Sequence, residues 1–204
     1  FEPSVELLLD IGQNVLGNKI NDPVIGSFWW PRFEEICKWF VDNQKNIFKS
    51  ELVTEEMGSY FFTTKLGNFE LKGKADRIEI LQDGNFEIVD YKTTSSPSIT
   101  DIEKGIKPQL QLLGLIAESG GFENLIIGKV SSLSYLSLSS SNKRGFHDLK
   151  NYRILIKDAE IGLKALISKF EELKTPYLFN PWFNTHTFDD YKQLSRHQLW
   201  LEDI

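Results

Sequence analysis

Residues 73–94 restrict the fold more than any other segment, because they combine two strand-like runs with a strong turn signal. The runs are joined by Asp83-Gly84, a dipeptide typical of the tight turn between antiparallel strands. The first run carries Asp76, and the second carries Asp90 and Lys92. Side chains two positions apart on a strand point to the same face, so Asp90 and Lys92 should project together. The segment therefore predicts a β-hairpin on which two acids and a lysine gather.

The register of this hairpin decides whether the three groups meet. With a strict two-residue loop, Asp76 would lie opposite Tyr91, on the face away from the other acid and the lysine. A three-residue loop with Gly84 in the left-handed region and a bulge would shift the register by one residue and bring the groups together. A local distortion at Asp76 would have the same effect. We therefore predict an irregularity in this hairpin.

The rest of the chain alternates between helical and strand-like patterns. Apolar residues at helical spacing predict helices over 4–16, 31–48, 101–118 and 157–173. Period-two patterns predict strands over 59–66, 68–81 and 85–93, with one or two more within 125–139. A polar loop is expected over 139–150 and a short helix near 188–200. This order predicts an α/β fold with a central mixed β-sheet flanked by helices.

Size and cysteine content narrow the class of protein. A chain of 204 residues is long enough for a real core, and we expect a single domain over 1–204. No apolar run approaches the ~20 residues that span a bilayer, so no membrane is expected as a partner. Cys37 is the only cysteine, which suits a reducing compartment and predicts a cytoplasmic protein. A lone cysteine also excludes an iron–sulfur cluster or a cysteine-based structural zinc site.

The net charge of −6 counts against strong autonomous binding to nucleic acid, which usually depends on a basic surface. A nuclease remains possible, because acids gathered around a metal ion would account for part of the excess negative charge.

Three motifs together resemble a known family. They are Gly73-Lys-Ala-Asp-Arg-Ile-Glu, Ile88-Val-Asp-Tyr-Lys-Thr-Thr and Lys107-Pro-Gln-Leu-Gln-Leu. The combination resembles the RecB-like branch of the PD-(D/E)XK nucleases. In detail it is similar to the C-terminal nuclease domain of AddB-type helicase–nuclease subunits, in the form without an iron–sulfur cluster. Further likeness lies in Phe28-Trp-Trp-Pro-Arg-Phe-Glu, Gly120-Gly-Phe-Glu and Thr175-Pro-Tyr-Leu.

The resemblance implies a restriction-endonuclease-like fold and assigns site residues. Asp76 matches the first acid of the family motif, although Ala75 stands where the superfamily's name has proline. Asp90 matches the second acid, and Lys92 matches the motif lysine. Gln109 matches a glutamine that begins the following helix in this branch.

Two departures from the family pattern follow from the same resemblance. Leu113 stands where the family usually has an aromatic residue, four positions after the glutamine. An upstream Gly-x-x-x-His helix, whose histidine or acid completes the metal site, is not found before Phe28. The resemblance therefore implies that this chain is truncated at its N-terminus and lacks one metal ligand. At the other end, residues 174–204 are expected to form an aromatic-rich extension.

Elementary chemistry supports the implied roles. One or two Mg²⁺ (or Mn²⁺) ions bridging Asp76 and Asp90 could activate water and stabilise charge on a phosphodiester. The backbone carbonyl of Tyr91 could add a ligand. Lys92 could hold the attacking water or the transition-state oxygens, and Gln109 could orient the lysine or the phosphate. The alternative for Asp90 and Lys92 is a plain salt bridge on an exposed strand.

Other charged residues are weaker candidates. Lys74 and Arg77 come from the same strand as the first acid and could contact the DNA backbone. Glu55 and Glu56 could be extra ligands, but a solvated sheet edge is the simpler interpretation.

Three hypotheses about function remain. The first is a Mg²⁺-dependent deoxyribonuclease domain, with exonuclease activity, of an AddB-type helicase–nuclease that acts in double-strand-break repair and recombination with an AddA-like partner subunit. The second is a stand-alone RecB-like exonuclease. The third is a catalytically inactive nuclease fold that docks a DNA end or a partner.

Overall fold

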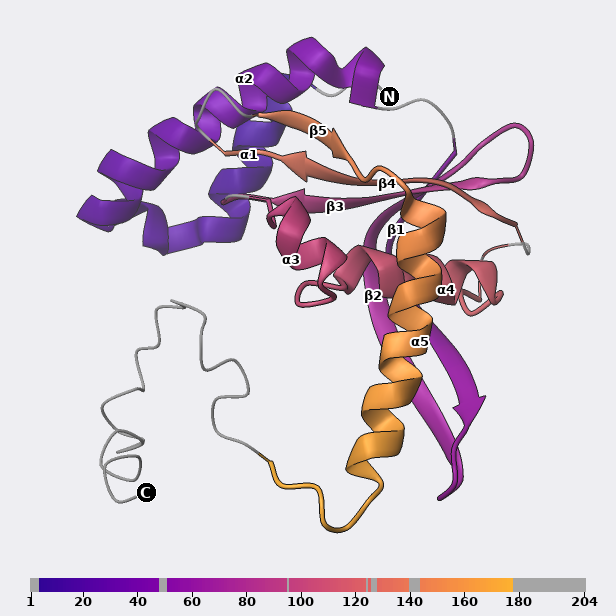
Figure 1. The fold of residues 1–204 in the computed structure, drawn as a ribbon. Coiled ribbons are helices and arrows are strands. Elements are labelled where there is room, and N and C mark those ends of the chain that lie inside the picture. The colour runs from indigo at the N-terminus through magenta and orange to yellow at the C-terminus, as the bar shows by residue number, and fades with distance from the viewer. Residues whose placement is uncertain are drawn as a thin grey trace, which may run out of the picture.

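The computed structural model of the chain describes residues 4–47, 51–94, 96–123, 125, 128–139 and 144–177. Helical elements come first, three strands follow, and further helices and strands complete the described chain (Figure 1). The helical elements are α1 (Val5–Leu16), η1 (Gly17–Asn21), η2 (Ile25–Trp29), α2 (Trp30–Ile47), α3 (Ile99–Glu103), α4 (Gln109–Glu118) and α5 (Tyr152–Phe170). The strands are β1 (Glu51–Thr63), β2 (Asn68–Ile80), β3 (Phe86–Lys92), β4 (Val130–Ser137) and β5 (Gly145–Asp148). The helix predicted near 188–200 and most of the 174–204 extension lie outside the described residues.

The described strands form one five-stranded sheet in the order β1-β2-β3-β4-β5. β3 and β4 run parallel, whereas the other neighbouring strands are antiparallel. A parallel pair cannot be joined by a tight turn, so the chain between β3 and β4 crosses over through α3 and α4. The mixed sheet with flanking helices confirms the predicted α/β fold class.

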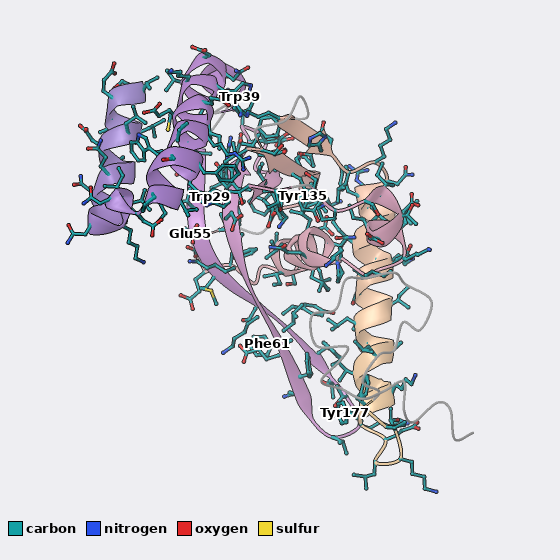
Figure 2. All side chains as sticks on the ribbon, turned by 90° about the vertical axis from the view of Figure 1, so that its left-hand side faces the viewer. Trp29, Trp39, Glu55, Phe61, Tyr135 and Tyr177 are labelled. Carbon is teal, nitrogen blue, oxygen red and sulfur yellow. The ribbon has the colours of Figure 1, made fainter. Side chains whose placement is uncertain are left out.

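Helices pack on both faces of the sheet (Figure 1). α4 lies on the face that holds the main core, and α5 packs against α4. Ile78 and Ile88 pack against Leu110 in this core, with Leu133 from β4. On the opposite face, Trp39 of α2 packs with Phe40 against Val89 and Leu136, and Figure 2 shows where Trp39 lies. Within the described residues, no helix is both long and apolar enough to cross a membrane.

The long β1–β2 hairpin projects beyond the sheet and lies beside α5 (Figures 1 and 2). The Tyr60 hydroxyl donates to Glu160 Oε1 at 2.7 Å, and Lys164 forms an ion pair with the same oxygen at 2.5 Å. Phe61 lies on the exposed side of this arm. The arm is therefore held to α5 by a polar contact from its inner side.

A close backbone contact joins the chain after α4 to the edge strand. The Ser59 N–H donates to the Gly121 carbonyl at 2.9 Å, and Gly58 pairs with Phe122 in an isolated bridge. A Cβ atom on Gly121 would collide with the Ser59 carbonyl, so only glycine permits this approach.

The structure differs from the predicted elements at several places, and three of these differences have a clear physical reason. β1 begins at Glu51, eight residues before the expected start, because an edge strand need not carry a continuous apolar pattern. The single helix expected over 101–118 is two helices, since Gly105 adopts a φ of 68° and Pro108 lacks an N–H. The loop expected over 139–150 contains β5, which is short and mostly exposed.

Candidate active site

The turn between β2 and β3 contains the irregularity that the sequence predicts. The Leu81 N–H donates to the Asn85 carbonyl, and the Gly84 N–H donates to the Leu81 carbonyl, each at 2.9 Å. Gly84 has a φ of 77°, in the left-handed region. These bonds define a three-residue loop over 82–84, as in a type I turn with a glycine bulge. The predicted one-residue shift in register is therefore confirmed.

The shifted register brings the two predicted acids close together. Arg77 pairs with Val89, and Ile78 pairs with Ile88. Asp76 and Asp90 come directly after the Arg77–Val89 pair on their two strands. The charge of Asp76 acts on the carboxyl group of Asp90, so the two acids occupy adjoining positions on neighbouring strands.

β2 is also distorted at Asp76. Ala75 and Ile78 both belong to the main core, although residues three apart on a regular strand face opposite sides. On the neighbouring strand Glu55 has a φ of 56°, which is uncommon for a residue other than glycine. The Asp76 side chain turns toward β3, where its Oδ2 accepts a hydrogen bond from the Tyr91 N–H at 2.9 Å. The Asp76 carboxylate thus accepts the hydrogen bond of the Tyr91 N–H in place of a backbone carbonyl of β2.

Asp90, Lys92 and Gln109 form a connected polar cluster. Lys92 Nζ lies 2.5 Å from Asp90 Oδ2, which confirms that the two side chains share a face. Gln109 Nε2 donates to Asp90 Oδ1 at 2.6 Å, and Gln109 Oε1 accepts from Lys92 Nζ at 3.1 Å. Gln109 is the first residue of α4, as predicted. The start of one helix thereby fixes the two charged groups at the end of β3.

Burial dominates the electrostatics of Asp90. The side chain is 2% exposed, and this desolvation raises the pKa of its carboxyl group. Lys92 opposes the shift, whereas the negative charge of Asp76 adds to it. Lys92, with 24% of its side chain exposed, connects this buried acid to solvent. The two carboxylates therefore form a site where additional positive charge would be favourable.

Tyr135 is a neighbour of this cluster that the sequence analysis missed. It pairs with Asp90 across the parallel β3–β4 ladder and lies in the interior (Figure 2). Burial, and to a lesser degree Asp90, raises its pKa to about 12, so its hydroxyl stays protonated at neutral pH. Lys92 Nζ lies 5.5 Å from the centre of its ring, within the range of a cation–π contact. The available signal was a tyrosine at an inward position of the strand expected beside β3.

The residues expected to contact DNA lie in different surroundings. Arg77 is 0% exposed and forms a buried ion pair with Glu79, while its Nη1 lies 3.4 Å from the Tyr91 hydroxyl. The burial of Arg77 counts against the expected contact with the DNA backbone, because the guanidinium has no exposed surface in this structure. Lys74 remains exposed and forms an ion pair with Glu55, which lies at the solvated edge as expected.

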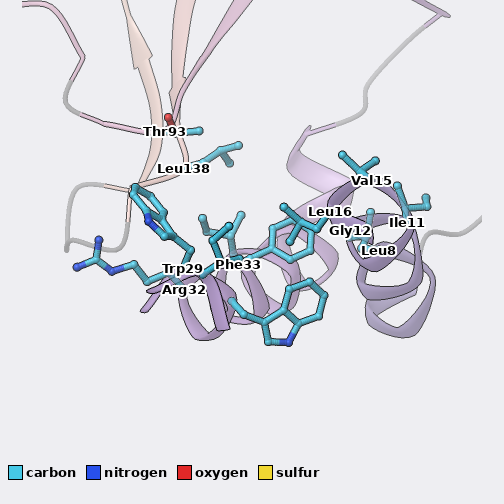
Figure 3. Close-up of a pocket in the computed structure, with 13 residues that line it drawn as sticks. Leu8, Ile11, Gly12, Val15, Leu16, Trp29, Arg32, Phe33, Thr93 and Leu138 are labelled. Carbon is cyan, nitrogen blue, oxygen red and sulfur yellow. The ribbon is translucent and has the colours of Figure 1, made fainter. Parts of the chain in front are cut away.

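An apolar cavity lies away from the acids, between α1, α2 and the sheet (Figure 3). It has a volume of about 700 Å³. Leu8, Ile11 and Val15 line it from α1, opposite Trp29 and Phe33 (Figure 3). Its apolar lining offers few polar groups, in contrast to the polar cluster on β3.

Comparison with known families decides how this site is interpreted. The model of the PD-(D/E)XK nuclease superfamily matches residues 24–197, which include the hairpin and Gln109. The chain belongs to the PD-(D/E)XK nuclease superfamily. The predicted superfamily is thereby confirmed.

Similar proteins occur in Rickettsia. This nuclease-superfamily domain is 24% identical to an uncharacterized protein of Rickettsia conorii over 215 residues, covering 93% of this chain and 25% of that protein. It is 27% identical to an uncharacterized protein of Rickettsia felis over 225 residues, covering 93% of this chain and 26% of that protein. The chain thus spans about a quarter of the length of these relatives. The crystal structure of SSO0001 covers 74% of this chain and 69% of its own at 12% identity, but its TM-score of 0.37 is too low to strengthen the assignment.

Nucleases of this superfamily typically use divalent metal ions, and the two acids fit such an ion. Mg²⁺ is commonly held by one or two carboxylates and completes its coordination with water and phosphate oxygens. Asp76 and Asp90 supply two carboxylates at adjoining positions, and a cation there would oppose the upward shift in the pKa of Asp90. Among the residues described, no group of three or more His, Cys, Asp or Glu side chains could hold a metal. With two carboxylates, most coordination positions of such an ion would be left to water or substrate oxygens.

Proposed function

We propose that this domain is a metal-dependent deoxyribonuclease that hydrolyses phosphodiester bonds in DNA. The observation that carries the proposal is the cluster in which Gln109 contacts both Asp90 and Lys92, with Asp76 close by on the next strand. A buried acid with a raised pKa, joined to a partly exposed lysine, is typical of catalytic sites, where perturbed pKa values cluster.

In this proposal Asp76 and Asp90 hold Mg²⁺ (or Mn²⁺), together with the backbone carbonyl of Tyr91. The ion, when bound, supplies positive charge that polarises the phosphodiester and activates water. The hydrogen bond from the Tyr91 N–H fixes the Asp76 carboxylate against β3. A carboxylate oriented in this way need not reorganise when the substrate arrives.

Lys92 acts on the reacting phosphate. Its ammonium group is a compact cation that donates to the attacking water or to the oxygens that gain charge in the transition state. Because its side chain is partly exposed, it can exchange part of its contact with Asp90 for a substrate oxygen. Gln109 is a positioning residue, since it holds the lysine and the acid in one arrangement.

We further propose that the parent protein is an AddB-type, RecB-like helicase–nuclease subunit that acts in the cytoplasm with an AddA-like partner in double-strand-break repair and recombination. Two observations support this proposal: the resemblance of the motifs and the fourfold greater length of the relatives. That length favours a domain within a larger machine over a stand-alone exonuclease. We also propose that a further metal ligand comes from outside the described residues, since these provide two carboxylates at the site.

A cleavage assay tests the proposed activity. Single- and double-stranded DNA, labelled at either end, would be incubated with Mg²⁺, Mn²⁺ or EDTA and with this chain, Asp90→Ala, Lys92→Ala and a version extended at its N-terminus. We expect metal-dependent cleavage, strongest in the extended version and lost in both variants, and release of mononucleotides from an end would identify an exonuclease. Absence of cleavage in the extended version would contradict the proposal and favour an inactive fold that docks DNA ends or partners.

A further inference from the structure

A second cavity lies directly beside the proposed site. Its volume is about 750 Å³, within the usual range for small-molecule pockets. Lys92 and Gln109 line it, so it shares a wall with the proposed catalytic cluster. The remaining wall comes from the segment after β3, from the link between α3 and α4, and from Tyr135 on β4.

Two hydroxyl groups of this pocket lack hydrogen-bond partners. The Tyr135 hydroxyl and Ser96 Oγ are both buried, and neither has a partner within the part of the chain that the structure describes. Tyr135 as a whole is 1% exposed. Burying a hydroxyl without a partner is unfavourable, so each of these groups is expected to bond to water or to a bound polar group. Two of them in one pocket, contributed by segments far apart in sequence, indicate a binding site.

The other lining residues indicate which ligand fits. Lys107 is exposed at the pocket and joins Lys92 in supplying positive charge, against the carboxylate of Asp101. Ile106 and Pro97 add apolar surface. A mixture of cationic, hydroxyl and apolar groups matches a nucleotide, which combines a phosphate and sugar with an apolar base face.

We propose that this pocket binds the nucleotide that adjoins the scissile phosphodiester of a DNA strand. The Tyr135 and Ser96 hydroxyls donate hydrogen bonds to that nucleotide, while the scissile phosphate lies at Lys92. This inference rests on the proposed nuclease function, because the shared wall places the neighbouring nucleotide here only if Lys92 contacts the scissile phosphate. It assigns substrate contacts to residues outside the family motifs.

The test measures the binding of a short ligand, so that it does not depend on cleavage. The full chain would be titrated with the 5′-phosphorylated dinucleotide pTpT in Ca²⁺, and the dissociation constant would be measured by calorimetry or by NMR shifts. Tyr135→Phe and Ser96→Ala each remove one hydroxyl from the pocket. Tyr60→Phe and Ser119→Ala are matched controls, because their hydroxyls bond to Glu160 and Ile116 away from the pocket.

We expect Tyr135→Phe and Ser96→Ala each to weaken pTpT binding by about tenfold, as for the loss of a hydrogen bond to a charged group. Their thermal midpoints should stay the same or rise, because each variant removes an unpaired buried hydroxyl. Tyr60→Phe should show the reverse, with a lower midpoint and unchanged affinity. A purely structural role for Tyr135 would lower the midpoint and leave binding unaltered.

Unchanged affinity in both Tyr135→Phe and Ser96→Ala would overturn the inference, as would a wild-type chain that does not bind pTpT at millimolar concentration. Neither result would decide the proposed function, which the metal-dependent cleavage of longer DNA tests separately. Conversely, pTpT binding that depends on both hydroxyls, in a protein that never cleaves DNA, would support the pocket and contradict the nuclease.

Discussion

Gln109 Nε2 donates a hydrogen bond of 2.6 Å to Asp90 Oδ1, and this contact links the first residue of α4 to the end of β3. The same amide accepts from Lys92 Nζ through its oxygen. One uncharged side chain therefore sets the relative position of a buried acid and a partly exposed lysine. The crossover between β3 and β4 is thus part of the site as well as of the fold.

Replacing this amide should impair cleavage and lower stability. We predict that Gln109→Ala lowers the cleavage rate by about ten- to a hundredfold, the effect of losing one or two hydrogen bonds to charged groups. The free energy of unfolding should fall by about 1–3 kcal/mol, because the exposed Gln109 buries no apolar surface but bonds to the buried Asp90 carboxyl group. Steady-state cleavage and thermal denaturation measure the two effects. Gln13→Ala, on the exposed surface of α1, is the matched control and should leave both quantities unaltered.

The raised pKa of Asp90 predicts a change in stability with pH. A carboxyl group whose pKa is raised by folding stabilises the protein fully below its unfolded pKa and loses this contribution as pH rises through the folded pKa. Asp90→Asn keeps the uncharged form at every pH. We therefore predict that this variant is at least as stable as the wild type at pH 7 in EDTA, and that any advantage disappears in acid.

Thermal denaturation between pH 4 and pH 8 checks this prediction. Asp90→Asn could instead be less stable than the wild type at pH 7, with the difference in stability disappearing in acid. The ion pair with Lys92 would then outweigh burial, and the pKa of Asp90 would be lowered and not raised. Added Mg²⁺ should raise the midpoint of the wild type but not of the variant, because a ligand that binds only the folded state stabilises it.

Arg77 should behave as a structural residue. Its removal in Arg77→Leu breaks the buried pair with Glu79, and we predict a loss of about 3–5 kcal/mol in the free energy of unfolding. Lys72→Leu, in an exposed pair with Glu70 on the same strand, should cost about 1 kcal/mol or less.

Urea denaturation of these variants, with the double variant Arg77→Leu/Glu79→Leu, provides the measurement. The double variant should recover much of the lost stability, since no unpaired charge stays buried. A stable Arg77→Leu variant that binds DNA more weakly would instead restore the original expectation of a DNA contact.

Two glycines should respond in opposite directions to alanine. Gly121→Ala should lose about 1–3 kcal/mol, because its Cβ would meet the Ser59 carbonyl and displace β1. Gly162 lies in the middle of α5 with open space around its Cβ position, so Gly162→Ala should gain about 1 kcal/mol from helix propensity. Chemical denaturation of both variants measures the difference. Equal effects would show that the close contact at Gly121 does not exist.

The hairpin and its register were predictable because chemistry and turn geometry agree there. Asp83-Gly84 restricts the loop to a few types, and a three-residue loop is the one that brings Asp76 toward Asp90. Gln109 at the start of a helix was likewise expected from the motif.

Features that depend on tertiary context were not predictable. Arg77 pairs with Val89, whose side chain packs against Trp39 of α2, and no local pattern reveals that this position is buried. Tyr135 reaches the site only through the parallel pairing of β4 with β3, a contact across 45 residues of chain. The short strand β5 was missed because one pairing partner, and not its own sequence, holds it in place.

The central claim is that Asp90 and Lys92 act as one metal-dependent catalytic unit, and a double-variant cycle tests it most directly. The cleavage rate in Mg²⁺ would be measured, in the N-terminally extended protein, for the wild type, Asp90→Asn, Lys92→Ala and the combined variant. Residues that act as a unit show strongly non-additive losses. We predict that the combined variant cleaves DNA no more slowly than the slower single variant. If the factors by which the two single variants lower the cleavage rate multiplied in the combined variant, the claim would be contradicted. Cleavage that persists in EDTA would contradict it as well.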